Sequence, residues 1–378
     1  MGRGAAVTPL TLLHVFPSFD VGGQQTRFVT IANRLGRTMR HHLLSLDGRD
    51  DAVALLDPKL DFELLPQPPA TPDLLRRMHR IVAICRANNY DALVTYNWGA
   101  IEFAMANRWF VCLPHIHFED GFGPDEALRQ KRRRVFVRKL VLPRSDLVVP
   151  SHRLEEIASR SWRLASHRVT YIPNGIDPQR FDDISASGAP FFDRQHGECV
   201  IGSFSPLRRE KNLSRLLNLF AGLPPLPLRT RLVLCGDGAE RSVLMHEAVR
   251  LGIADRITFT GHVPRPEMVM GAFDIFAITS DTEQMPYAVL EAMAARLPVL
   301  ATDVGDIAAM VSVQNRPFVI PPADPTALTA GLAQLCRDLC LRRQIGRANR
   351  TKVQRQFDVD SMAKAFQRVL LRIVPPRR

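Results

Sequence analysis

The chain has 378 residues, 46% of them hydrophobic and 23% charged, and 50 Lys and Arg against 38 Asp and Glu give a formal net charge of +12. This length favours two domains over one core, and the composition excludes a low-complexity or disordered chain. The positive excess favours an anionic partner: a phosphorylated ligand, a polyanion or an anionic membrane. Because no apolar run reaches membrane-spanning length and no secretory leader is recognisable, we expect a cytoplasmic protein, open to peripheral membrane contact.

In the first half of the chain, strand-like apolar runs alternate with amphipathic helix-like runs. The first strand pattern leads into Gly22 and Gly23, and the helix pattern after them closes at Gly36. Ser151 is a plausible N-cap for a later helix. The expected strands are 10–19, 41–46, 91–97, 146–151 and 168–177, with helices at 25–36 and 73–89. The turn-rich segment 178–197 is typical of a linker.

The same alternation restarts after the linker. Strands are expected at 199–204, 231–238, 256–261, 274–280 and 298–303, with helices at 212–223, 240–252, near 266–272 and before the last strand. Such alternation predicts the α/β class, with two doubly wound, Rossmann-like domains that face a cleft. Sites in these folds lie beyond the carboxyl ends of the strands, so the cleft is the expected active site.

Two glutamates with seven residues between them stand near the last of these strands. Glu283 falls on the loop after strand 274–280, whereas Glu291 falls on the following helix, with Pro286 suited to the first helical position. The free N–H groups at that helix start suit a phosphate. Taken singly, Glu283 could be a solvated loop charge, and Glu291 could complement the dipole of its own helix.

The order of several motifs resembles one family. The Glu-X7-Glu pair and the "AMAARLPVLATDVGDI" that directly follows it resemble the signature of the family 4 retaining glycosyltransferases, which have the GT-B fold. "FDVGGQQTRFVTIANRLG", "YIPNGID", "IGSFSPLRREKNLSRLL", "LVLCGDGAERSVL", "ITFTGHV" and "QFDVDSMAKAFQRVLLRI" follow the order of that family. The resemblance implies an acceptor-side domain at 1–177, the linker at 178–197, a nucleotide-sugar-binding domain at 198–356, and a helix at 357–378 that crosses back to the first domain.

The resemblance also implies roles for individual residues. Lys211 and an arginine before it would clamp the donor diphosphate, and because Pro206 occupies the usual arginine position, Arg208 is preferred over Arg209. Glu283 would contact the donor sugar and Glu291 the ribose hydroxyls. The alternative for "RREK" is a solvated basic loop. The remaining donor-binding candidates are Gly22, Gly23, Gly236, Gly238, His262, Val263, Pro286, Tyr287 and Ala288.

A histidine of the first domain completes the expected site. His117 resembles the family's histidine near the reacting centre, His115 is its competitor, and a satisfied core histidine is the alternative for either. The "QMP" before Tyr287 departs from the family's Gly-Phe-Gly, which puts donor-sugar contacts of that loop in question.

The implied activity is transfer of a sugar from a nucleotide-sugar donor to a glycan or lipid-linked acceptor in cell-surface polysaccharide or glycolipid synthesis. Retention of configuration comes from the resemblance, and no cofactor or metal is expected. An oxidoreductase is disfavoured because Arg241 stands where a dinucleotide fingerprint needs its third glycine. A GT-B sugar-nucleotide 2-epimerase stays an alternative. A nucleic-acid-binding protein is disfavoured because no basic motif is interleaved with aromatic residues, so no nucleic-acid partner is expected.

Residues 129–139, "RQKRRRVFVRK", carry seven cationic side chains. We expect a helix here with Phe136 and Leu140 on one stripe packed into the core and the other cations facing outward. Such a basic surface predicts contact with an anionic membrane. The alternative is a solvated basic face.

Overall fold

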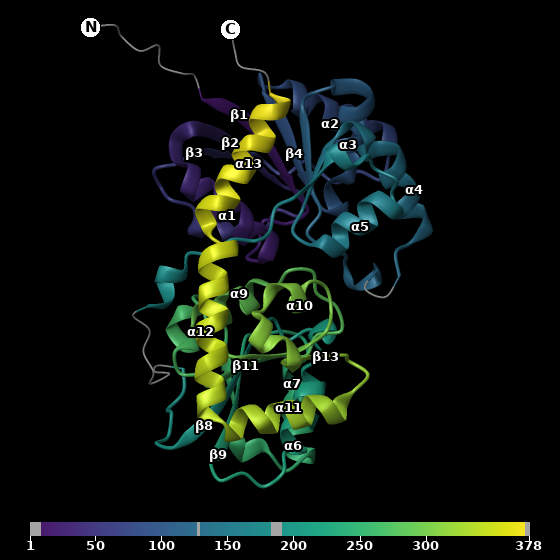
Figure 1. The fold of residues 1–378 in the computed structure, drawn as a ribbon. Helices are drawn as coiled ribbons and strands as arrows, with labels where there is room; N and C mark the ends of the chain where they lie inside the picture. The colour runs from purple at the N-terminus through teal and green to yellow at the C-terminus, as the bar shows by residue number, and fades with distance from the viewer. Residues whose placement is uncertain (1–8, 127–128, 183–190, 375–378) are drawn as a thin grey trace, which may run out of the picture. The chain divides into compact units, whose positions relative to one another are not determined.

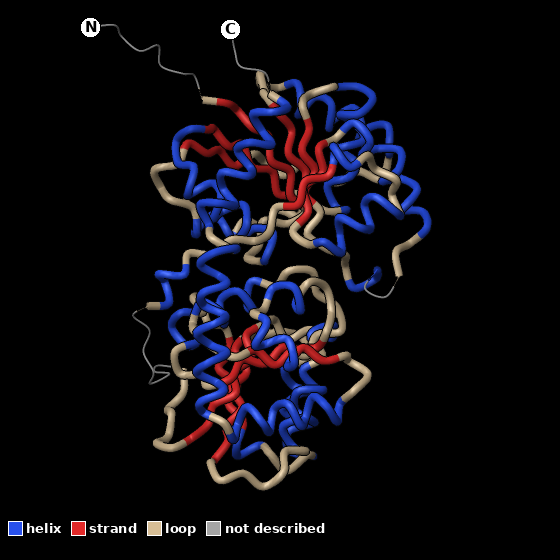
Figure 2. Tube along the Cα trace, viewed as in Figure 1, coloured by secondary structure: helices blue, strands red, loops and turns tan. Residues whose placement is uncertain are grey.

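A computed structural model describes residues 9–126, 129–182 and 191–374. The chain divides into two compact units. The first unit combines Met1–Asn174 with Val359–Arg378, and the second is Gly175–Asp358. Figure 2 shows a sheet in each unit with helices packed around it. The α/β class with two doubly wound parallel sheets is therefore confirmed.

The sheet of the first unit has seven parallel strands in the order β3-β2-β1-β4-β5-β6-β7. The order reverses between β1 and β4, which makes this pair the switch point of the sheet. The strands are β1 (Leu10–Phe16), β2 (Met39–Ser45), β3 (Asp61–Leu64), β4 (Ala92–Tyr96), β5 (His115–Phe118), β6 (Asp146–Val149) and β7 (Val169–Tyr171).

Helices cover both faces of this sheet. They are α1 (Gly23–Leu35), α2 (Leu74–Arg86), α3 (Ile101–Ala106), α4 (Arg132–Val141), α5 (His152–Arg160) and α13 (Val359–Ile373). The Ser151 side chain caps α5 by accepting from the Leu154 N–H, as expected. Helix α13, drawn in yellow in Figure 1, lies beside α1 and contributes Phe366 and Leu370 to the same apolar core.

One expectation for the first unit is wrong. Phe136 and Leu140 of α4 do not pack into the core, since their exposed fractions are 61% and 47%. The inner face of α4 is instead occupied by Arg138 and Val141, each 1% exposed. Acidic and aromatic neighbours hold Arg138, and this turns the apolar stripe outward.

The second unit has a six-stranded parallel sheet in the order β10-β9-β8-β11-β12-β13, with its switch point between β8 and β11. Successive residues of β8 enter two different cores, with Val200 on one face and Cys199 and Ile201 on the other. The strands are β8 (Glu198–Phe204), β9 (Arg229–Cys235), β10 (Ile257–Gly261), β11 (Ile275–Ile278), β12 (Val299–Thr302) and β13 (Val319–Ile320).

The helices of this unit are α6 (Leu213–Ala221), α7 (Arg241–Arg250), α8 (Glu267–Met270), α9 (Tyr287–Ala294), α10 (Ile307–Met310), α11 (Pro325–Arg337) and α12 (Leu339–Gln356). The segment expected as a linker belongs to this unit, and Phe181 and Phe192 from it are buried in the core. Its residues 183–190 lie outside the described residues.

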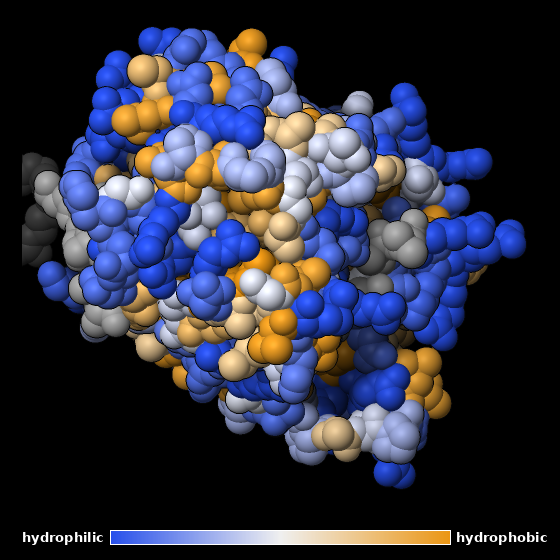
Figure 3. Space-filling view, turned by 90° about the horizontal axis from the view of Figure 1, so that it is seen from below, coloured by the Kyte–Doolittle hydropathy of each residue, from blue (hydrophilic) through white to orange (hydrophobic). Residues whose placement is uncertain are grey.

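The surface is of mixed polarity. Figure 3 shows hydrophilic and hydrophobic side chains intermingled over the face drawn there. Among the described residues, no helix combines the length and the apolar character that crossing a membrane requires.

Candidate active site

The switch point of the second unit brings two predicted motifs together. The chain leaves β8 into the loop that carries Arg208 and Lys211, and it leaves β11 into the loop that carries Glu283. Because β8 and β11 are neighbours in a parallel sheet, both loops emerge at the same edge. This edge is where doubly wound sheets bind their ligands.

The two loops meet through one cation and one carboxylate. Lys211 Nζ lies 2.6 Å from Glu283 Oε1, and the side chains are 21% and 9% exposed. The same Glu283 oxygen accepts a 2.7 Å hydrogen bond from the Ser280 hydroxyl. Charge-assisted bonds of this length fix both groups at the mouth of the sheet.

Polar contacts behind this pair hold the loops in place. Asn212 adopts a left-handed conformation with φ 43°, and its side chain caps α6 by accepting from the Arg215 N–H. The Asn212 amide also donates to Asp281, 3.0 Å away, and Arg215 donates to Asp281 at 2.8 Å and to the Thr279 carbonyl at 2.6 Å. The loop after β8 is thus tied to the loop after β11 on either side of Lys211 and Glu283.

Glycines allow these loops to approach their neighbours. Gly236 and Gly238 have positive φ, and a Cβ on either would lie 2.0 or 2.4 Å from the carbonyl oxygen of Ser205 or Leu207. These two glycines therefore let the loop before Arg208 lie against the end of β9. Gly305 does the same for the second loop: an added Cβ would lie 2.3 Å from the Glu283 carbonyl oxygen.

Helix α9 carries the second glutamate. Glu291 is 9% exposed, and burial raises its pKa to about 7, with Arg180 lowering it and Glu267 raising it further. The placement of Glu283 on a loop and Glu291 on a helix agrees with the sequence prediction. Pro286, however, is the residue before the helix, with ψ 127°, so Tyr287 and Ala288 form the first turn.

The other donor-binding candidates of this unit differ in exposure. Arg208 and Arg209 are both exposed, and in the described part of the chain neither guanidinium forms an ion pair or hydrogen bond. Either could reach a diphosphate. His262 is exposed, but the Val263 side chain is 3% exposed and packs in the core. The Val263 side chain is therefore a core group and does not act as a ligand contact.

In the first unit, the glycine loop also lies at a switch point. Gly22 is the N-cap of α1 and Gly23 its first residue, and a five-residue loop joins them to the end of β1. The Asn97 side-chain amide, just after the neighbouring strand β4, donates to the side-chain oxygen Oε1 of Gln24 at 3.2 Å. The amino end of α1 is thus presented at the ligand-binding edge of this sheet.

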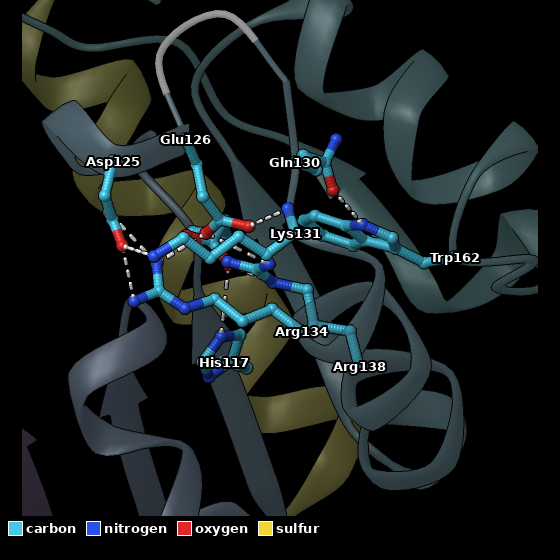
Figure 4. Close-up of polar contacts among 9 residues, drawn as sticks. His117, Asp125, Glu126, Gln130, Lys131, Arg134, Arg138 and Trp162 are labelled. Carbon is cyan, nitrogen blue, oxygen red and sulfur yellow. Dashed lines mark hydrogen bonds and ion pairs between the residues drawn. The ribbon is translucent and has the colours of Figure 1, made fainter.

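The predicted histidines lie deep in the first unit. The Thr95 hydroxyl is 2.8 Å from His115 Nε2 and 2.7 Å from His117 Nδ1, and the Ser145 hydroxyl is 2.7 Å from His115 Nδ1. His117 Nε2 faces Glu119 at 3.8 Å. Figure 4 shows His117 near Arg138. Burial lowers the pKa of His115 to about 3. The core-histidine alternative fits these surroundings, and a role for His117 in the reaction stays a prediction.

Sequence reasoning missed an acidic residue at the same edge. Asp120 follows β5, and its backbone N–H donates to the Asn97 side chain at 2.7 Å. Arg27, 1% exposed, pairs with Asp120 at 2.6 Å and donates to the Ile172 carbonyl. Burial raises the pKa of Asp120, and Arg27 opposes that effect. The signal in the sequence was the acidic pair directly after "HIHF".

No group of three or more His, Cys, Asp or Glu within the described ranges is arranged to hold a metal ion. The expected independence from metal stays a prediction, because the reaction can recruit a metal with its substrate.

Comparison with known proteins agrees with this geometry. A family model described as "Glycosyltransferase Family 4" matches residues 21–180, and one described as "Glycosyl transferases group 1" matches residues 191–352. The two matches together cover most of both units, apart from the ends of the chain and residues 181–190.

Individual proteins show the same likeness. The D-inositol 3-phosphate glycosyltransferase of Stackebrandtia nassauensis is 29% identical over 66% of this chain, and the match spans 61% of that relative. The lipopolysaccharide core biosynthesis mannosyltransferase LpcC of Rhizobium leguminosarum is 26% identical over 62% of this chain and 67% of its own length.

Among solved structures, HepE of Anabaena in complex with UDP superposes with a TM-score of 0.81 at 20% identity, over 96% of this chain and 99% of that one. That likeness extends the shared fold across both units. The tandem family matches, the two doubly wound sheets and the Glu-X7-Glu site place this chain among the family 4-type glycosyltransferases with the GT-B fold.

Proposed function

We propose that the protein transfers a sugar from a nucleotide-sugar donor to a glycan or lipid-linked acceptor, with retention of configuration. The observation that carries the proposal is the Lys211–Glu283 pair at the switch point of the second unit. The relatives named as glycosyltransferases and the UDP complex of HepE support a nucleotide-sugar donor.

The chemistry follows from where charge develops. When the glycosidic bond breaks, the nucleoside diphosphate leaves with added negative charge, and fixed cations at that point lower the barrier. Lys211, with Arg208 or Arg209 beside it, supplies those cations. Glu283 orients the Lys211 ammonium and presents a carboxylate oxygen to the donor sugar, and Glu291 accepts from the ribose hydroxyls.

We further propose that the acceptor belongs to cell-surface polysaccharide or glycolipid synthesis at the cytoplasmic face of a membrane. Support comes from LpcC, which is named for lipopolysaccharide core biosynthesis. Lipopolysaccharide is a lipid-linked glycan, and an enzyme that extends such an acceptor works where the lipid is held.

Thermal unfolding in the presence of UDP-, GDP- and ADP-sugars tests the donor. A ligand that binds only the folded protein raises the unfolding temperature. At a hundredfold excess over Kd, it adds about 2.7 kcal/mol to the free energy of unfolding. The stabilising donor is then incubated with acceptor fractions. Failure of every nucleotide sugar to stabilise the protein, or release of an epimerised sugar nucleotide without acceptor, would contradict the proposal.

Metal independence is tested in the same transfer assay. Because Lys211 and a neighbouring arginine carry the charge that a metal would supply at the diphosphate, activity should survive an excess of EDTA. Complete loss of transfer, restored by Mg²⁺ or Mn²⁺, would show that these cations alone do not suffice.

A further inference from the structure

Helix α4 is turned the opposite way from an ordinary surface helix. At about 100° per residue, Phe136 and Leu140 lie on one side of the helix and Arg134 and Arg138 on the other. The arginine side faces the protein: Arg138 is 1% exposed and the Arg134 side chain 16%. The apolar side faces outward, with Phe136 61% and Leu140 47% exposed.

The buried arginine makes this orientation obligatory. Arg138 Nε donates to Glu119 Oε2 at 3.0 Å, and its guanidinium lies 3.7 Å from Glu126. The guanidinium also lies over the rings of Trp98 and Trp162, at 5.1 and 4.8 Å. A charge removed from water needs such partners. Rotating α4 to bury Phe136 and Leu140 would move Arg138 away from Glu119 and leave that buried carboxylate without its cation.

The second arginine and a lysine add to this anchor. Arg134 pairs with Glu126 and Asp125, both at 2.8 Å, and Lys131 pairs with Asp125 at 2.6 Å. Figure 4 shows these side chains converging beside Trp162 and His117. The acidic residues nearest to α4 are therefore used to hold the helix to the protein.

Within the ranges that the structure describes, the cations of the outward face, Arg132, Arg133 and Lys139, form no ion pair with a carboxylate. Arg132, Arg133 and Lys139 flank Phe136 and Leu140 within about 60° of the Phe136 direction. Arg132 and Arg133 are exposed. The sequence has no Asp or Glu between Glu126 and Asp146, and the Asp146 side chain is already paired with Arg168 and Arg372.

We propose that the outer face of α4 docks on an anionic lipid bilayer. Phe136 and Leu140 enter the boundary between headgroups and acyl chains, while Arg132, Arg133 and Lys139 contact lipid phosphates. An apolar pair ringed by cations on one helix face matches this surface in both polarity and charge. The inference goes beyond sugar transfer and does not depend on it, because it concerns binding in the absence of any donor.

Vesicle flotation tests the proposal with the full chain. We expect binding to mixed phosphatidylcholine–phosphatidylglycerol vesicles at low salt, little binding to pure phosphatidylcholine, and release by high salt. Arg132→Glu/Arg133→Glu should lower the partition coefficient at least about tenfold, since each cation near an anionic leaflet contributes favourably. Phe136→Ser/Leu140→Ser keeps every charge and should also bind several-fold more weakly.

A matched control comes from α2 of the same unit. Leu75 is 80% exposed, and so is the neighbouring Arg76 side chain, so Leu75→Ser/Arg76→Glu removes one exposed apolar group and reverses one charge elsewhere on the surface. This variant should float like the parent. All altered side chains are outward, and unchanged thermal unfolding would show that each variant is folded.

Three results would overturn the proposal. One is equal binding to neutral and anionic vesicles, or none to either at low salt. Another is an equal loss in the α2 control. The third is a lipid-independent dimer, seen by light scattering and abolished by Phe136→Ser/Leu140→Ser, which would assign the outer face of α4 to a second copy of the chain.

Discussion

At the scale of single residues, the site of the second unit is a cation whose position depends on a carboxylate. Lys211 has a flexible stem, and the Glu283 carboxylate lies 2.6 Å from its ammonium. Ser280 fixes the same carboxylate oxygen. Under the proposed function, an incoming diphosphate would meet a lysine that is already placed, which would reduce the reorganisation needed during the reaction.

Replacement of Glu283 measures this arrangement. Glu283→Ala should lower kcat roughly 10²–10³-fold, the scale of one preorganised transition-state contact. Asp281→Asn is the matched control, because Asp281 lies in the same loop but bonds Asn212 and Arg215 instead. It should stay within a few-fold of the parent in a steady-state transfer assay. Near-normal turnover of Glu283→Ala with the true donor would remove Glu283 from the reaction.

Glu291 should make donor binding depend on pH. Burial raises the pKa of Glu291 to about 7, so the free protein carries this carboxyl partly protonated near neutrality. Accepting from ribose hydroxyls favours the ionised form, and affinity should therefore fall about tenfold per pH unit below about pH 7. Calorimetric titration with the nucleotide sugar measures this slope, because its diphosphate, unlike the terminal phosphate of a nucleoside diphosphate, does not take up a proton in this pH range. Glu291→Gln should bind more weakly at high pH and lose the slope; an unaltered slope would contradict the assignment.

At the scale of elements, the loop between β12 and α10 supports the loop after β11. Gly305 has φ +60°, and its missing Cβ leaves room for the carbonyl oxygens of Glu283 and Gln284. The Asp306 N–H donates to the Gln284 carbonyl at 2.9 Å. The position of the Glu283 backbone therefore depends on a glycine of the neighbouring loop.

A pair of glycine variants separates this support from ordinary backbone strain. Gly305→Ala should lower kcat at least about tenfold, because the new methyl group displaces the Glu283 backbone. A displacement of about 1 Å in a catalytic group is enough to lower a reaction rate by that factor. Gly252→Ala places Ala at a similar φ, +68°, with open space around it. It should cost about 1 kcal/mol of unfolding free energy and leave kcat unchanged. Equal kcat for both variants would argue against the support role.

The elements also show what the sequence could predict. The longer apolar runs, such as β1, β8 and β9, are buried on both faces and were recognisable as strands. Strand β5 was not assigned, because "HIHF" is half polar. His115 can be buried there because its two ring nitrogens form hydrogen bonds with Thr95 and Ser145. The two residues of β13 are too short to carry a pattern.

Helix α4 shows a second limit of pattern reasoning. Its apolar stripe predicted core packing at Phe136, but Glu119 and two tryptophans far away in the sequence turned Arg138 inward. Likewise, the motifs indicated roles for Lys211 and Glu283, whereas their direct contact required the strand order of the folded sheet. Long-range partners of charged groups are what a single sequence does not reveal.

At the scale of the whole molecule, the two units can be observed separately. All three tryptophans, Trp98, Trp109 and Trp162, belong to the first unit. Tryptophan fluorescence therefore reports the unfolding of the first unit alone, while circular dichroism reports both units. The cores of the two units also differ in chemistry, since buried histidines are gathered in the first.

Those histidines should make the first unit sensitive to acid. Burial lowers the pKa of His41 to about 4 and of His115 to about 3, and it also lowers that of His14, which bonds His41. The unfolded chain then binds more protons than the folded one below about pH 6.5, so stability is present above that pH and falls with acidification. By about pH 5, protonation of His41 and protonation of His115 in the unfolded chain should each lower the free energy of unfolding by about 2 kcal/mol, a large share of a typical domain's stability. Asp120 opposes part of this loss, because burial raises its pKa.

Urea unfolding followed by tryptophan fluorescence should show a midpoint that drops between pH 7 and about pH 5, and His41→Gln, which cannot titrate, should show a shallower drop. A midpoint independent of pH, or an equally steep drop in His41→Gln, would mean that protonation of the buried histidines does not cause the loss of stability in acid.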